Sequence, residues 1–117
     1  MNIEEFRAHC ISKPGVTEGF PFDNNTLVFK VMGKMFALLD VDEFESFNVK
    51  CNPDLALEFR SQYDGVKPGY HMNKKHWNTV SPMSDVPEDL LYEFIDHSYN
   101  LVVNSLTRKA QAELKNL

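Results

Sequence analysis

Residues 26–40, with the sequence TLVFKVMGKMFALLD, decide the fold that we expect for this chain. Two runs of β-branched, aromatic and aliphatic residues, Thr26–Met32 and Met35–Asp40, stand on either side of Gly33-Lys34. Two such runs around a Gly-X pair are typical of a β-hairpin with a type II′ turn, because glycine reaches the positive φ that this turn requires. The stretch therefore predicts two adjacent antiparallel strands.

Further short strands are expected on both sides of this hairpin. Val16–Phe22 precedes it, and Ser46–Cys51 follows it with alternating apolar residues. Later, Lys67-Pro68-Gly69 is typical of a turn, and Tyr70–Met72 and His76–Val80 are expected as two strands joined by a short connection. Short links between consecutive strands indicate an antiparallel sheet.

Three helices are expected. The first begins at the capping residue Asn2, and Lys13-Pro14-Gly15 ends it. The second begins at Asn52, with proline next in the chain. Its apolar positions recur four residues apart, at Leu55, Phe59 and Tyr63. The third is expected to start with Asp85 as its cap and Glu88 three residues later, and to run past Arg108. The order of elements predicts an α+β fold with helices packed on one face of an antiparallel sheet, including N- and C-terminal helices.

The length and composition fit one domain, residues 1–117. Hydrophobic residues make up 43% of the chain and charged residues 25%, which excludes wholesale disorder. The formal net charge of −5 weighs against a dedicated non-specific DNA binder, since such affinity comes mostly from neutralising phosphates, although a local basic patch is compatible with it.

The cysteines and the N-terminus indicate a compartment. Cys10 and Cys51 form no CxxC pair and are expected as small apolar residues with reduced thiols. The polar start of the chain does not have the pattern of a signal peptide, and no stretch approaches the roughly 18 apolar residues of a membrane span. We therefore expect a cytoplasmic protein of bacterial type, monomeric and without a membrane partner.

Four stretches resemble the MmcQ/YjbR-like family of small proteins. In chain order they are FKVMGKMF at 29–36, VKCNP at 49–53, VKPGYHMNKKHW at 66–77 and SYNLVV at 98–103. The third stretch is the most specific. The resemblance implies a compact α+β domain with an antiparallel sheet, similar in layout to bacterial frataxin, and it brings no enzymatic activity and no cofactor. Members of the family are often labelled DNA-binding, and a winged mode of binding has been suggested for the fold.

The segment from Lys67 to Trp77 carries the candidate binding residues. Cationic, imidazole and aromatic side chains are concentrated there, at Lys67, His71, Lys74, Lys75, His76 and Trp77, with Tyr70 beside them. Lysines on a hairpin tip suit phosphate oxygens, and exposed rings can stack on bases, which predicts weak and salt-sensitive DNA binding. The alternative is that Trp77 anchors the sheet to the long helix and the lysines only solubilise a loop. A second alternative is an adaptor that binds a protein or a small molecule in a cleft beside Tyr70 and Trp77.

The sequence contains no convincing metal site or catalytic constellation. His71 and His76 are five residues apart, which is not the i, i+4 spacing of a helical zinc motif. The acidic group at Asp40, Asp42, Glu43 and Glu45 is expected to be a solvated turn rather than a cation site. Cys51 is the best candidate nucleophile, but no flanking motif supports it. We therefore expect a protein without enzymatic activity.

Overall fold

The expected hairpin is present in a computed structural model that describes residues 1–117, and its turn lies one residue earlier than predicted. Strand β2 (Thr26–Val31) pairs with β3 (Lys34–Asp40). Met32 and Gly33 form the two-residue connection, with φ of 49° and 82°. Positive φ at both central positions is the type I′ pattern, so the type II′ prediction at Gly33-Lys34 is wrong. The type I′ turn matches the twist of the strands and lets Lys34 pair with Val31.

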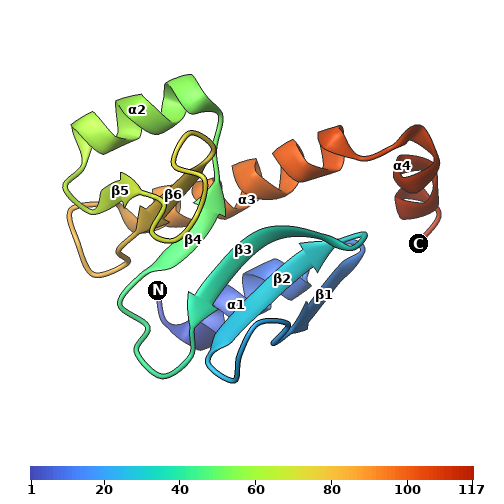
Figure 1. The fold of residues 1–117 in the computed structure, drawn as a ribbon, viewed down its shortest axis with the longest axis horizontal. Helices are drawn as coiled ribbons and strands as arrows, with labels where there is room; N and C mark the ends of the chain where they lie inside the picture. Colours follow the sequence, from blue (N-terminus) through green and yellow to red (C-terminus); the bar gives the residue numbers. More distant parts are fainter.

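Six strands form one antiparallel sheet in the order β1-β2-β3-β4-β6-β5 (Figure 1). The remaining strands are β1 (Val16–Gly19), β4 (Phe47–Lys50), β5 (Val66–Pro68) and β6 (Trp77–Val80). Every neighbouring pair is antiparallel. The strand expected over Val16–Phe22 already ends at Gly19, and Pro21, which has no N–H to donate to a ladder, follows two residues later.

Strand β5 occupies residues that were expected to form a turn. Val66 pairs with Val80, and Pro68 pairs with Asn78. Tyr70–Met72, expected as a strand, is instead part of the connection from β5 to β6. Burial explains this choice: Val66 is 1% exposed and extends the core, whereas Tyr70 is 70% exposed. Pro68 is tolerated at the end of an edge strand because no partner there requires its missing N–H.

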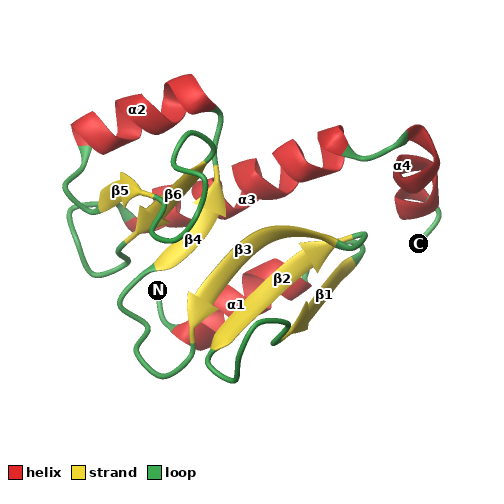
Figure 2. Cartoon of the chain, viewed as in Figure 1, coloured by secondary structure: helices red, strands yellow, loops and turns green.

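The four helices are α1 (Ile3–Ile11), α2 (Pro53–Gln62), α3 (Glu88–Ser105) and α4 (Arg108–Lys115). Both α1 and α3 lie behind the sheet in the view of Figures 1 and 2, so one sheet face is covered by helices. Asn2 begins α1 as expected, because its side chain accepts the N–H of Glu5 while the Glu5 carboxylate accepts the N–H of Asn2. The α+β prediction with an antiparallel sheet is confirmed.

Aromatic rings fill the space between the helices and the sheet. Phe6 of α1 lies 4.8 Å from Phe47 and 5.8 Å from Phe29, measured between ring centroids. Phe36 meets Tyr99 of α3 edge-on at 5.5 Å. Such tilted and edge-on pairs are the preferred geometry of buried rings, and they stabilise the fold by more than the burial of their apolar area alone.

Helix α2 packs at the β5 end of the sheet, with a different buried face from the predicted one. Phe59 contacts Phe94 of α3 edge-on at 4.8 Å. Ala56 is fully buried, whereas Leu55 is 37% exposed. The stripe expected from Leu55, Phe59 and Tyr63 is therefore correct for its last two members only, since both of these pack against the core.

The long C-terminal helix starts later and ends earlier than predicted. Pro87 is the residue before α3, with no side-chain cap, because Asp85 bonds elsewhere. The helix stops at Ser105, and Thr107 then caps α4 by accepting the N–H of Ala110 at 3.1 Å. This break replaces the expected continuous helix and turns α4 back so that Leu114 reaches the core. None of the helices has the length and apolar character needed to cross a membrane.

Candidate functional site

The face of the sheet opposite the helices carries its own small apolar cluster. Val28, Leu38 and Trp77 are buried there, with Met35 and Met72 half-buried around them. Trp77 is 7% exposed. It therefore packs on the helix-free face, and the expectation that it anchors the sheet to the long helix is wrong. The cross-strand register explains this. Trp77 pairs with Lys50, whose neighbour Val49 faces the helices. Successive residues of a strand point to opposite faces, so Lys50 and Trp77 face away from the helices.

The loop of residues 69–76 covers part of this face. Gly69 donates its N–H to the Trp77 carbonyl at 2.8 Å. A Cβ at Gly69 would lie 2.8 Å from the Trp77 Cβ, so only glycine permits this approach. The N–H of Tyr70 donates to Thr79 Oγ1 at 2.9 Å, and the Thr79 hydroxyl bonds to the side chain of Asn48. These bonds fix the start of the loop above strands β4 and β6.

Arg60 holds the other end of the loop, and the sequence did not reveal it. Its Nε donates to Asn78 Oδ1 at 2.7 Å, and its Nη2 donates to the carbonyls of Trp77 at 3.1 Å and of Lys74. A rigid guanidinium with several donors suits this role. In the sequence Arg60 appears only as a basic residue in the last turn of a helix, which is common and carries no signal.

A groove of about 560 Å³ opens between this loop and strands β2, β3 and β4. Its apolar walls come from Phe22, Met35, Leu38, Tyr70 and Met72. Phe22 is 67% exposed and Tyr70 is 70% exposed, so two large rings face solvent at the groove. Cavities of this size, with rings and a few polar groups, are typical of small-molecule sites.

The backbone beside the groove is held in an unusual conformation. His71, which lines the groove, has a φ of 59°, in the left-handed region that non-glycine residues rarely adopt. Its ring lies 4.0 Å from the Tyr70 ring, centroid to centroid. The two neighbouring rings therefore restrict each other's movement. The exposed ring of Tyr70 is thereby held at the groove.

The predicted basic and aromatic residues do not share one environment. Lys67 is on β5, and the pKa of Asp85 is lowered chiefly by the backbone N–H groups of Asp64 and Gly65, with the charge of Lys67 as the smallest contribution. Lys74 and Lys75 are exposed on the loop, and Lys74 Nζ lies 3.5 Å from the Gly69 carbonyl. His76 is half-buried at the loop end, and the ring of Trp77 is covered.

The acidic group after β3 forms a turn, as expected, and also lines the groove. Asp40 Oδ1 accepts the N–H groups of Asp42 at 2.9 Å and Glu43 at 3.2 Å. Asp40, Glu43 and Glu45 all contribute to the groove, together with Asp23 of the β1–β2 loop. In the structure, histidine, cysteine and carboxylate side chains nowhere gather in a set of three suited to a metal ion.

Both thiols are poor nucleophiles in this fold. Burial raises the pKa of the Cys51 thiol to about 11, and burial also raises that of Cys10. The Cys51 side chain is 4% exposed and that of Cys10 is fully buried. The thiolate is the reactive form of cysteine, so these thiols are unreactive at neutral pH.

The fold and this groove define a class: small α+β proteins whose antiparallel sheet has helices on one face and an open groove on the other. The chain belongs to the YjbR family, whose sequence profile matches residues 11–101. It is 39% identical over 107 residues to the YbdF protein of Escherichia coli O157:H7, covering 91% of this chain and 88% of that protein. It is 32% identical to the YjbR protein of Escherichia coli K12 over the full length of both.

Solved structures share the architecture. The crystal structure of Deinococcus radiodurans protein DR2400, a DUF419 domain, has a TM-score of 0.92 and 37% identity, with 97% of this chain and 88% of that chain covered. A crystal structure of a Pseudomonas syringae protein has a TM-score of 0.73 and 25% identity, with 86% and 98% covered. The family expected from the four sequence stretches is therefore confirmed.

Proposed function

We propose that this protein is a binding module without enzymatic activity, and that its ligand is a small molecule held in the groove on the helix-free face. One observation carries the proposal: Tyr70 and Phe22 stay exposed beside a cavity of about 560 Å³ whose floor includes Leu38 and Met35. Exposed rings at a concave surface lose water when a ligand binds, and aromatic residues often dominate binding energy. The high pKa of Cys51 supports the non-enzymatic part, because the best candidate nucleophile stays protonated.

The proposal is tested by replacing the exposed ring. A fragment that binds the wild-type groove, found by amide chemical-shift changes at Tyr70 and Met72, should bind Tyr70→Ala roughly tenfold more weakly, the loss that corresponds to about 1.4 kcal/mol. Leu57→Ala is the matched control, since Leu57 is a large apolar residue on α2 that is 63% exposed and lies outside the groove. A fragment library that produces no shifts at the groove would contradict the proposal.

DNA binding is the second candidate, and the exposed pair Lys74 and Lys75 favours it. If DNA is the ligand, further phosphate contacts around the loop would come from Lys67, His71 and His76. The net charge of −5 and the burial of Trp77 weigh against high affinity, so any binding should be weak and fall steeply with salt.

Fluorescence anisotropy with a labelled duplex at low salt tests this candidate. The double variant K74E/K75E should weaken binding and flatten the dependence of log affinity on log salt, by about 0.9 in slope for each phosphate that is no longer neutralised. K109E/K115E makes the same charge change on α4, away from the loop, and should behave more like the wild type. If the wild-type protein shows no binding up to roughly 100 µM, DNA binding is excluded as a function.

We also propose that the protein works as a monomer in a bacterial cytosol. The bacterial sources of the relatives and the two free, buried cysteines support this proposal. Cell fractionation followed by light scattering of the purified protein tests both parts. Recovery in the membrane fraction, or a mass of two chains, would contradict it.

A further inference from the structure

We propose that the groove selects organic cations, namely a protonated amine or a quaternary ammonium attached to an aromatic or aliphatic body. This inference rests on the proposed function and adds the charge of the ligand to it. The observation behind it is the composition of the lining. The charged residues there are all carboxylates, at Asp23, Asp40, Glu43 and Glu45, with no lysine or arginine among them.

The carboxylates divide into two kinds. Those of Asp23 and Asp40 accept backbone N–H groups of their own turns. These bonds hold the pKa of Asp23 below its ordinary value, chiefly through the N–H of Asn25, so this group is ionised at neutral pH. Glu43 and Glu45 are exposed, and their side chains take part in none of the hydrogen bonds or ion pairs of the structure. They are the two acids free to pair with a ligand.

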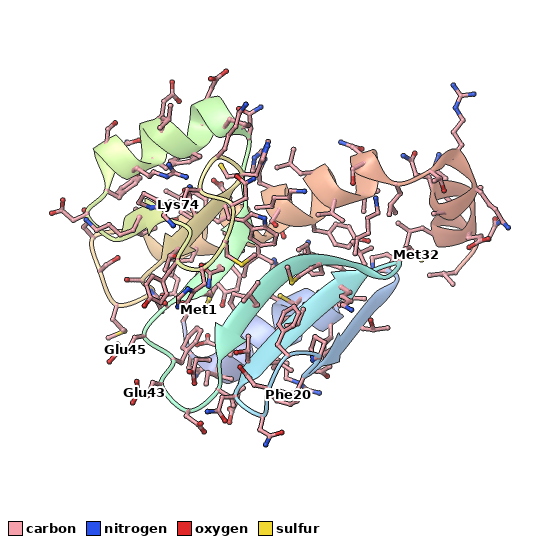
Figure 3. The ribbon with its side chains drawn as sticks, viewed as in Figure 1. Met1, Phe20, Met32, Glu43, Glu45 and Lys74 are labelled. Atoms are coloured by element: carbon pink, nitrogen blue, oxygen red, sulfur yellow. The ribbon has the colours of Figure 1, made fainter.

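Charge is distributed unevenly around the groove. Figure 3 shows Glu43 and Glu45 together on the loop that follows β3, near the lower end of the sheet, whereas Lys74 lies near its upper end beside β6. A concave site whose charged residues are all negative concentrates cations and repels ligands with phosphate or carboxylate groups. An anionic ligand such as a nucleotide is therefore disfavoured in this cavity, even though the loop nearby carries lysines.

The apolar walls suit the other part of such a ligand. Tyr70 and Phe22 offer ring faces that attract a cation, and this attraction adds to that of the carboxylates. Met35 and Met72 are flexible and polarizable, so they can adapt to an aliphatic or aromatic body. The volume of about 560 Å³ accommodates a molecule of that kind rather than a folded segment of another protein.

Three matched probes test the inference: phenethylammonium, phenethyl alcohol and phenylacetate. They share a ring and differ in charge. Titrations followed by the amide shifts of Asn48, Tyr70 and Met72 should give the order cation, alcohol, anion. The cation should bind about tenfold more tightly than the alcohol, from one ring contact and two exposed carboxylates.

Variants separate the charge from the pocket. The double variant E43Q/E45Q should reduce the preference for the cation over the alcohol to about twofold or less, and leave the affinity for the alcohol unchanged. E58Q/E113Q removes two exposed acids on α2 and α4 and should keep the full preference. All four residues are exposed, so the variants should fold, which circular dichroism checks.

Each outcome has one meaning. If the cation and the alcohol bind the groove equally well, the inference is wrong and the proposed function stands. If none of the three probes nor any other fragment shifts the groove amides, the proposed function fails, and the inference fails with it. If E43Q/E45Q keeps the cation preference, the assignment of these two glutamates is overturned.

Discussion

At the scale of single residues, Ser98 shows how one hydroxyl joins a helix to two strands. Its Oγ accepts the N–H of Lys50 at 2.8 Å and donates to the carbonyl of Phe36. The register that pairs Ala37 with Val49 would next place Phe36 opposite Lys50. The serine hydroxyl therefore occupies the place of a direct bond between the strands, at the point where Phe36 bulges out of the β2–β3 register.

Replacing Ser98 with alanine should lower the free energy of unfolding by about 1–3 kcal/mol, because a buried N–H and a carbonyl lose their partner. Urea unfolding measures the change. Ser105→Ala is the control: its hydroxyl bonds only the Val102 carbonyl in its own helix, so the change should stay within about 0.5 kcal/mol. Equal effects of the two substitutions would show that the bridge between β3 and β4 contributes nothing.

Trp77 illustrates what the sequence could and could not say about the site. Of the segment around it, Tyr70, His71 and Met72 line the groove, whereas Lys67, Lys74, Lys75 and His76 do not. The sequence left the role of Trp77 open, because a ring in a basic and aromatic stretch can serve binding or packing equally well. Only the strand register, which puts Trp77 beside Val28 and Leu38, shows that it packs.

At the scale of elements, helix α2 depends at its first turn on a histidine from α3. The N–H of Asn52 donates to His97 Nε2 at 3.1 Å, so this nitrogen must be unprotonated. Burial lowers the pKa of His97 below its ordinary value of 6.5. The unfolded chain therefore takes up this proton at higher pH than the folded chain, and stability falls as the pH drops below about 6.5.

A titration of the His97 ring by NMR should thus give a pKa below 6.5, with the Asn52 amide shifting in parallel. In His97→Gln, which cannot titrate, the decrease in stability between about pH 7 and 5 should become shallower. A His97 pKa at or above its ordinary value would contradict the buried acceptor role.

The break between α3 and α4 is marked by local side-chain bonds but is decided by packing. Thr107 is a good capping residue, and Gln111 Nε2 also donates to the Leu106 carbonyl at 3.0 Å. A cap in the middle of a helix-forming sequence is a weak signal, because threonine is also found inside helices. Packing decides in favour of the break, since it allows Leu114 to be buried.

At the scale of the whole molecule, acid should destabilise the fold. The N–H of Asn25 holds the pKa of Asp23 below its ordinary value of 3.8, and the N–H of Asp64 does the same for Asp85. The unfolded chain regains these protons first, so the contribution of these two carboxylates to stability is complete above about pH 4 and is lost as the pH falls through the lower folded values. The urea concentration at the midpoint of unfolding should therefore decrease as the pH falls below 3.8.

Asp85→Asn should be less stable than the wild type near neutral pH and should lose less stability in acid. Asp89→Asn, an exposed acid in the first turn of α3, serves as the control and should keep the wild-type acid dependence. Identical responses of the two variants to acid would show that Asp85 has no special part in the acid sensitivity.

By itself, the sequence determined the features that depend on residues close along the chain: the β2–β3 hairpin, the capped start of α1 and the start of α2 at Asn52. Tertiary structure alone decided that Val66 begins a strand, that Asp85 holds the α2–β5 turn instead of capping a helix, and that the groove exists. The groove brings together acids and rings from three loops: Phe22 and Asp23 between β1 and β2, Glu43 and Glu45 between β3 and β4, and Tyr70 between β5 and β6. Such contacts between distant segments arise only from strand register and shared burial, which local propensity does not encode.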